Sequence, residues 1–203
     1  MAKSPAKGEA LHDLGREGAR RAKRWLEATS RVDACWVNPD KGAGDKLTCA
    51  WPVGGQSFSF DLGGRLRYGD FDGQLFYAEV KKYGTYSGLN DHYVSFLAKC
   101  YVFYLAKSEF ADNFVWLSWT PHGTSRWATL TSPAEVRDAV IKHAATIFPA
   151  GTDPQTAVDD DACRAVSERL WLLIVSDKQE TLVPDVEHLA LIHSHEMKKA
   201  AGQ

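Results

Sequence analysis

The amino-acid sequence predicts an α/β fold in which helices flank a central mixed β-sheet. Two stretches with helical periodicity, at residues 9–28 and 90–107, lie on either side of a pair of strand-like runs. Two later apolar runs, at residues 114–120 and 170–175, have the length and composition of buried strands. Strands interleaved with helices in this way are typical of a sheet that helices cover.

Length and composition favour a single domain. The chain has 203 residues with 44% hydrophobic content, and residues 9–203 are expected to bury one core. Residues 1–8 are small and basic and are expected to be a disordered tail. Four widely separated cysteines without metal-ligand spacing indicate a reducing interior, and the sequence has neither a signal core nor a bilayer-spanning run. We therefore expect a cytoplasmic protein that has no membrane partner.

Residues 9–28 form the first predicted helix. Small and apolar side chains recur at helical spacing, so one face can pack against a sheet. Glu17 borders this face, and basic residues cover the rest of the helix. The apolar face comprises Leu11, Leu14, Gly18, Ala22, Trp25 and Leu26, and the basic face comprises Arg16, Arg20, Arg21, Lys23 and Arg24.

The other elements follow from local composition. Short strands are expected at residues 31–36 and 47–51, separated by a loop rich in Gly, Asn and Asp. Ser132 and Glu135 are spaced as in a helix-capping box, so a helix should begin there and continue to residue 147. Further along we expect a short strand at residues 127–130, a helix at 155–169, a fully apolar and therefore interior strand at 170–175, and a terminal helix at 185–199.

The central stretch, residues 58–83, predicts a β-hairpin because two strand-like runs enclose a turn-rich segment at residues 69–73. Side chains alternate along the second run, so Glu79 and Lys81 share a face. A carboxylate and an ammonium in so hydrophobic a strand are costly to desolvate, so we expect that something at this position requires them. One face carries Leu75, Tyr77, Glu79 and Lys81, and the other carries Phe76, Ala78 and Val80.

The position of the turn decides which residue lies opposite Glu79. A hairpin centred on Asp70 places Asp61 there, so that two carboxylates and Lys81 converge. Like charges this close raise each other's pKa unless a cation lies between them, and Mg²⁺ prefers oxygen ligands of this kind. Such a site suits metal-assisted phosphodiester hydrolysis. A turn at Asp72 would instead shift the register and leave Asp70 and Asp72 as fallback metal ligands.

Asp61, followed after the hairpin by Glu79-Val80-Lys81, resembles the core signature of the PD-(D/E)XK nuclease superfamily, which includes restriction endonucleases and Holliday-junction resolvases. The resemblance covers roughly the first half of the chain. Phe60, and not proline, precedes Asp61, which is a departure from the full signature. The resemblance implies a restriction-endonuclease-like αβββαβ core, here with C-terminal α/β additions, that uses Mg²⁺ or Mn²⁺.

The same resemblance assigns roles to individual residues. Asp61, Glu79 and the backbone carbonyl of Val80 are expected to bind the metal, and Lys81 is expected near the attacking water. Glu17, within Gly15-Arg16-Glu17-Gly18, is similar to the acidic element of the superfamily's first helix, where it would complete the metal site or orient a water. The alternative is that Glu17 pairs with Arg21 one helical turn away.

The charge distribution fits a nucleic-acid partner. Residues 1–107 contain 16 Lys and Arg against 12 Asp and Glu, whereas residues 108–203 contain 8 against 14. Basic side chains supply most non-specific affinity for nucleic acids, although a solvated surface of mixed charge has the same composition. Weak DNA contacts are expected from Arg20, Lys82, Tyr86 and Lys99.

These observations lead us to expect a Mg²⁺-dependent DNA endonuclease acting in DNA defence, repair or recombination. Two alternatives remain open: a catalytically inactive nuclease-like subunit that binds DNA or protein, and an RNA-directed nuclease. The resemblance also implies a possible homodimer or partner protein subunits.

Overall fold

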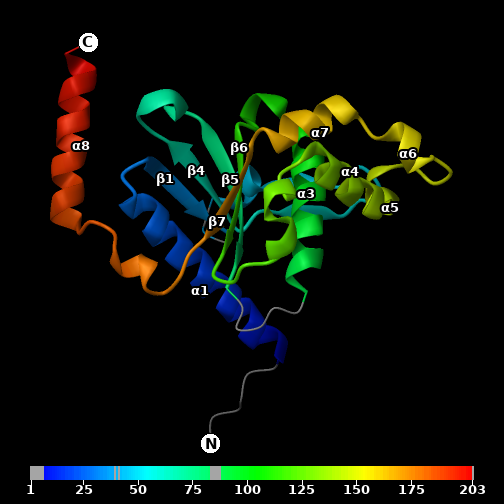
Figure 1. The fold of residues 1–203 in the computed structure, drawn as a ribbon, viewed down its shortest axis with the longest axis horizontal. Helices are drawn as coiled ribbons and strands as arrows, with labels where there is room; N and C mark the ends of the chain where they lie inside the picture. The colour runs from blue at the N-terminus through cyan, green and yellow to red at the C-terminus, as the bar shows by residue number, and fades with distance from the viewer. Residues whose placement is uncertain (1–6, 39, 41, 83–87, 203) are drawn as a thin grey trace, which may run out of the picture.

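A five-stranded mixed sheet forms the centre of the computed structural model, which describes residues 7–38, 40, 42–82 and 88–202 (Figure 1). The strand order is β1-β4-β5-β6-β7. The first three strands pair antiparallel, and the last three pair parallel, so the expected α/β fold with a mixed sheet is confirmed. The strands are β1 (Val32–Val37), β4 (Leu62–Leu66), β5 (Leu75–Lys81), β6 (Asn113–Ser118) and β7 (Leu170–Ile174).

Two helices cover opposite faces of this sheet (Figure 1). Helix α1 (Lys7–Ala28) packs its small residues against the face that carries Ala78 and Val80. Helix α3 (Leu89–Ala106) packs against the face that carries Tyr77. The predicted alternation along β5 is therefore confirmed, because neighbouring side chains enter two separate cores.

The β4–β5 hairpin has the register that a turn centred on Asp70 requires. Leu62 pairs with Ala78, and a short 3-10 helix, η1 (Gly69–Phe71), forms the turn. The first predicted run is nevertheless not one strand. Its beginning, β3 (Ser57–Ser59), pairs with β2 (Thr48–Ala50) in a separate two-stranded sheet, and the chain crosses into the central sheet at residues 60–61.

The elements after β6 depart most from expectation. Ser132 caps α4 by accepting a hydrogen bond from the Glu135 amide, as predicted, but the helix ends at Lys142 and a separate turn follows. The predicted helix at 155–169 is also divided, because Asp159 leaves the helical conformation and caps α7 with its carboxylate. The helices here are α4 (Pro133–Lys142), α5 (Ala144–Ile147), α6 (Pro154–Ala157) and α7 (Asp160–Ser167).

One strand prediction in this half is wrong, and a second is right in position but wrong in burial. Residues 127–130 belong mostly to a 3-10 helix, η3 (Thr124–Thr129), because the chain turns tightly after Gly123 in the left-handed conformation. The apolar strand β7 is not interior: it is the edge strand of the central sheet, and Trp171 is 36% exposed. The remaining short elements are α2 (Gly44–Leu47), η2 (Ser108–Phe110) and η4 (Gln179–Thr181).

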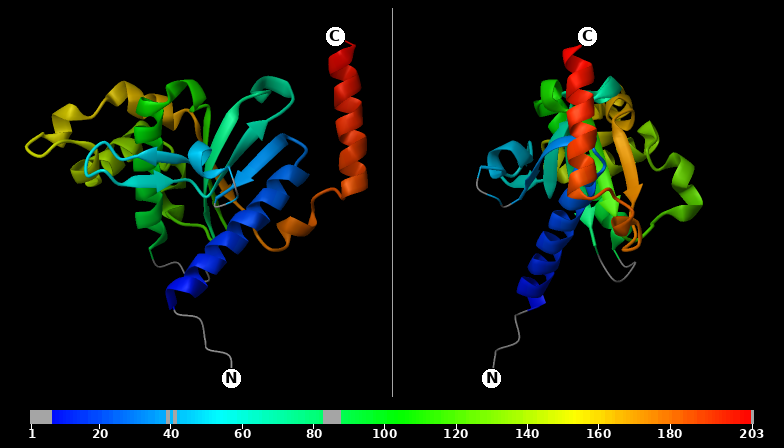
Figure 2. Two further views of the ribbon diagram at one scale, coloured as in Figure 1. Left: turned by 180° about the vertical axis from the view of Figure 1, so that it is seen from behind. Right: turned by 90° about the vertical axis from the view of Figure 1, so that its left-hand side faces the viewer.

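The chain ends in α8 (Val186–Ala201), which stands to one side of the rest of the molecule in Figure 1 and in the left view of Figure 2. At the other end, α1 begins at Lys7, two residues before the helix was expected. In the described parts of the chain, no helix combines the length and the apolar character needed to cross a bilayer.

Candidate functional site

Asp61, Glu79 and Lys81 meet where β4 begins beside the end of β5. The hairpin register extends one residue beyond Leu62, since the Asp61 amide donates to the Ala78 carbonyl at 3.0 Å. Asp61 Oδ2 accepts a hydrogen bond from the Val80 amide at 2.8 Å. Lys81 Nζ lies 2.7 Å from Glu79 Oε1 and 3.7 Å from Asp61 Oδ2. The structure thus brings together the three side chains that the sequence places on one face of the hairpin.

Burial makes this cluster electrostatically demanding. The side chains of Glu79 and Lys81 are only 8% and 9% exposed, whereas that of Asp61 is 38% exposed. Ionised groups removed from water in this way are tolerated only when they are paired and hydrogen-bonded. Lys81 meets that requirement by contacting both carboxylates.

Lys99 is a member of the cluster that the sequence analysis placed elsewhere. Its Nζ lies 3.0 Å from Glu79 Oε2 and donates to the Ser59 carbonyl at 3.2 Å, although we expected this side chain to contact DNA. Helical spacing could have indicated that Lys99 faces the sheet. It lies three residues after Phe96 and four before Phe103, which are both fully buried, and residues with these spacings share a helix face. Both oxygens of Glu79 are therefore held by lysines.

The two carboxylates consequently differ in pKa. Burial raises the pKa of Glu79, but Lys99 and Lys81 together outweigh it and lower the pKa below its usual range. Burial and the nearby negative charge of Glu79 raise the pKa of Asp61 to about 6, against the opposing influence of Lys81. One carboxylate is thus firmly ionised, and the other carries a negative charge that the protein does not fully compensate.

His92, in the first turn of α3, is a second neighbour that the sequence analysis did not identify. Partial burial lowers the pKa of its imidazole, and the positive charge of Lys81 lowers it further. A neutral imidazole therefore stands near the cluster at physiological pH. His92 belongs to α3 and Lys81 to β5, so only the packing of α3 on β5 reveals that they are close.

The chemistry of the donor set suits a hard divalent cation. Asp61 and Glu79 already offer carboxylate oxygens to one cation, the Lys81 ammonium, and Val80, the residue between Glu79 and Lys81, carries a backbone carbonyl of the same ligand type. In the described ranges of the chain, no three His, Cys, Asp or Glu side chains gather closely enough to hold a metal. Metal binding here would rest on two carboxylates and backbone oxygen.

Glu17 does not join this cluster. Its Oε1 lies 3.3 Å from Lys82 Nζ and 4.0 Å from Arg21 Nη1. Next to it, Gly18 of α1 lies close to Val80, on the face of β5 opposite Glu79. The structure therefore favours the ion-pair alternative for Glu17 over a place at the metal site.

The fallback ligands Asp70 and Asp72 lie at the far end of the hairpin. Asp72 Oδ1 accepts a hydrogen bond from the Tyr68 amide at 2.7 Å, which stabilises the turn. The observed register excludes the shifted pairing that would have given either aspartate a role beside Glu79. The structure contradicts both as ligands of this site.

The proposed DNA-contacting residues are dispersed. Arg20 is exposed on α1, where it borders a surface depression together with Arg16, Lys23 and Arg24. Lys82 pairs with Glu17, and Lys99 with Glu79. Tyr86 lies outside the described residues. A basic surface on α1 is thus the clearest candidate contact with a polyanion.

Comparison with known proteins assigns no family to the chain. The chain has no significant match among protein-family models, curated proteins or solved structures.

Proposed function

We propose that the protein is a Mg²⁺-dependent DNA endonuclease that hydrolyses phosphodiester bonds. The observation that carries this proposal is the convergence of Asp61 and Glu79 on the ammonium of Lys81. If α2, the separate β2–β3 sheet and the 3-10 turns are left out, the remaining elements up to β6 support the proposal. They follow in the order α1, β1, β4, β5, α3, β6, which is the αβββαβ order that the PD-(D/E)XK resemblance implies. DNA defence, repair or recombination would each be a suitable setting.

In this proposal Asp61, Glu79 and the Val80 carbonyl would hold the cation. A bound Mg²⁺ supplies Lewis acidity, which lowers the pKa of water and stabilises negative charge in an in-line displacement at phosphorus. Manganese would serve the same ligands.

The protein side chains then have separate tasks. Lys81 offsets negative charge that builds on the phosphate oxygens and orients the attacking water, for which its ammonium needs no lowered pKa. Lys99 is a positioning residue, because it fixes Glu79 through the carboxylate oxygen that Lys81 does not contact. The Val80 amide fixes the orientation of Asp61.

The direct test is cleavage of plasmid and branched DNA in Mg²⁺, Mn²⁺ or EDTA. We expect activity with either metal and none in EDTA, and we expect Asp61→Asn, Glu79→Gln and Lys81→Met each to lower the rate by about 10²-fold or more. Glu17→Gln is the matched control, since Glu17 pairs with Lys82 and should leave the rate nearly unchanged. Equal activity in all variants would remove the catalytic assignment.

A binding role without catalysis is the second candidate. It is favoured by the observation that both oxygens of Glu79 are already held by lysines. An inactive scaffold of this kind should show no heat of Mg²⁺ binding that Asp61→Asn abolishes, whereas the nuclease should show it. If activity is found, competition between DNA and RNA substrates decides whether the enzyme is RNA-directed.

A further inference from the structure

Helix α8 is only lightly attached to the rest of the protein. All 16 of its residues belong to the described part of the chain, and none of them is buried. Apart from the cap at Asp185, a single side-chain hydrogen bond between described residues joins α8 to the body: Arg67 Nη2 and His193 Nε2 lie 2.9 Å apart. A guanidinium can only donate, so His193 accepts through an unprotonated Nε2. The attachment of α8 therefore depends on a neutral imidazole.

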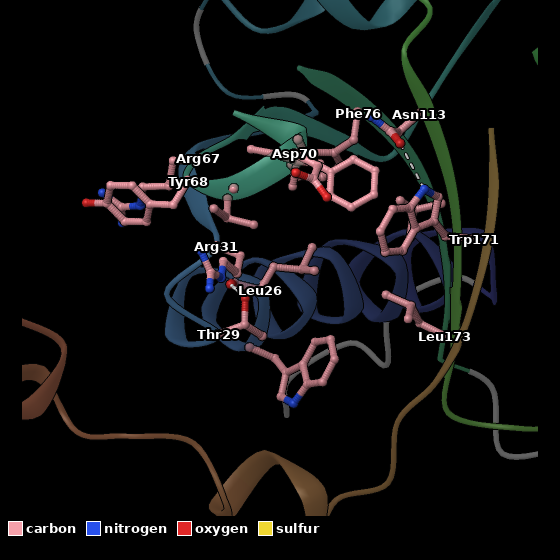
Figure 3. Close-up of a pocket in the computed structure, with 16 residues that line it drawn as sticks. Leu26, Thr29, Arg31, Arg67, Tyr68, Asp70, Phe76, Asn113, Trp171 and Leu173 are labelled. Atoms are coloured by element: carbon pink, nitrogen blue, oxygen red, sulfur yellow. Dashed lines mark hydrogen bonds between the residues drawn. The ribbon is translucent and has the colours of Figure 1, made fainter. Parts of the chain in front are cut away.

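This contact lies at one end of an apolar groove of about 470 Å³ between α1 and the central sheet (Figure 3). Arg67 lines the groove, and its Nη1 pairs with Asp33 of β1 at 3.4 Å. Its Nε is buried and has no hydrogen-bond partner among the described residues. A buried donor without a partner is costly, so the position of Arg67 depends on the partners of its two terminal nitrogens. His193 is one of these partners.

His193 is the group at this contact whose charge changes near neutral pH. Partial burial lowers the pKa of its imidazole, and the positive charge of Arg67 lowers it further, against the opposing influence of Asp33. Arg67 remains protonated throughout. Asp33 remains ionised, because its hydrogen bond from Arg65 lowers the pKa of its carboxyl. On α8 itself, the charged residue one turn from His193 is Glu196.

Protonation of His193 removes the acceptor and places two positive charges at the contact. An imidazolium donates from both nitrogens and accepts at neither, so Arg67 Nη2 loses its partner. Like charges this close also repel, so the protonated histidine favours the detached helix. By linkage, attachment is strongest above the pKa of the detached histidine and weakens as the pH falls through it. One proton limits this change in the equilibrium constant to about tenfold per pH unit.

The segment before α8 has a separate attachment that does not involve His193. Arg21 of α1 forms an ion pair with Glu180 in this segment. Asp185 then caps α8 by accepting a hydrogen bond from the His188 amide at 2.9 Å. This hydrogen bond lowers the pKa of Asp185, so the cap persists in mild acid. The helix can therefore leave the hairpin as an intact unit that pivots about residues 181–184.

We propose that α8 is a pH-sensitive strap, held on the β4–β5 hairpin while His193 is neutral and released when His193 is protonated. Release frees the guanidinium of Arg67 at the end of the groove, where it becomes available to another acceptor. The strap is independent of the nuclease assignment, because neither residue of the contact belongs to the cluster around Glu79.

Distances between two spin labels on the full chain test this proposal. Asp70→Cys on the hairpin tip and Lys198→Cys on α8 provide exposed labelling positions, and the native cysteines at 35, 49, 100 and 163 are buried, so the introduced thiols react selectively. We expect one narrow distance distribution at pH 7.5 and a second, broad population at pH 5.5. The ratio of released to attached helix should rise severalfold, within the limit of about 100-fold that one proton sets over two pH units.

Substitutions separate His193 from every other titrating group. His193→Gln keeps a side-chain acceptor that cannot be protonated, so its released population should be the same at both pH values. His193→Lys carries a permanent positive charge and should be released at both. His195→Gln, at an exposed position on the same helix, is the matched control and should respond as wild type does.

Three outcomes would overturn the strap. The first is a wild-type distance distribution that is the same at pH 7.5 and 5.5. The second is a His193→Gln variant that responds to pH as wild type does. The third is a loss of helical circular dichroism at pH 5.5, because the helix would then unfold instead of leaving the hairpin intact.

Discussion

At the scale of single residues, the pairing of Lys99 with Glu79 predicts a stability effect. Replacing Lys99 by Met leaves one oxygen of a buried carboxylate without its cation, and breaking a buried pair on one side costs about 3 kcal/mol. We expect the free energy of unfolding, measured in urea, to fall by that order, and Lys99→Arg to recover much of it. Lys178→Met, at an exposed position, is the control. An unchanged stability in Lys99→Met would show that Lys81 alone satisfies Glu79.

Asp61 predicts a pH dependence of stability without added metal. Its pKa is raised from 3.8 to about 6 by burial and by Glu79, so the folded state holds the proton more tightly than the unfolded state. Stability should therefore decrease as the pH rises from about 4 to 6. Solvent reduces the size of this loss because the side chain is 38% exposed. Urea unfolding in EDTA should show the decrease in wild type and a smaller one in Asp61→Asn.

The sequence allowed part of this cluster to be predicted. Asp61 and Glu79 lie at equal distances from the turn, so hairpin symmetry alone places them together. Lys99 and His92 could not be assigned in the same way, because their contacts depend on the rotation of α3 about its axis over the sheet. Spacing within one helix does not determine that rotation.

At the scale of elements, Gly63 of the hairpin that aligns the cluster has almost no room for a side chain. A Cβ atom on Gly63 would lie 2.9 Å from the Phe76 carbonyl oxygen and 2.7 Å from Leu47 Cδ2, and the carbonyl belongs to backbone that cannot move independently. We expect Gly63→Ala to destabilise the protein by about 1–3 kcal/mol in thermal or urea unfolding.

Gly15→Ala provides the matched control for this substitution. Gly15 is exposed on α1, and a Cβ there would meet nothing within 4 Å. Alanine is the better helix former, so this variant should be stabilised by up to about 1 kcal/mol. Equal effects of the two substitutions would mean that the hairpin relaxes around the added methyl group.

The sequence predicted correctly those elements whose pattern is local, and it failed where an element depends on pairing with distant residues. The alternation of β5 and the serine cap of α4 are local patterns, and both are confirmed. The capping box is not completed, because the Ser132 amide donates to the Thr129 carbonyl and the Glu135 carboxylate pairs with Arg126. The apolar run of β7 predicted burial. Whether a strand lies at the edge of a sheet depends on whether another strand pairs with its free side, and the sequence of the run carries no information on this. The division of the first run into β3 and β4 likewise depends on pairing with β2.

At the scale of the whole molecule, charge separates along the chain. Residues 1–107 have an excess of four basic residues, whereas residues 108–203 have an excess of six acidic ones. The acidic cluster and α1 both belong to the basic half. A polyanionic substrate would therefore be attracted more by residues 1–107, the half of the chain that contains the proposed catalytic residues, than by residues 108–203.

This distribution predicts how DNA affinity depends on salt. Arg16, Arg20 and Arg24 are exposed on α1, and each phosphate contact contributes about 0.9 to the slope of log affinity against log salt for duplex DNA. Replacing all three by Gln should weaken binding at low salt and reduce the slope by up to about 2.7. Fluorescence anisotropy of a labelled duplex in EDTA measures both without cleavage. Arg164→Gln, in the acidic half, should change neither, and an unchanged slope in the triple variant would show that DNA approaches another surface.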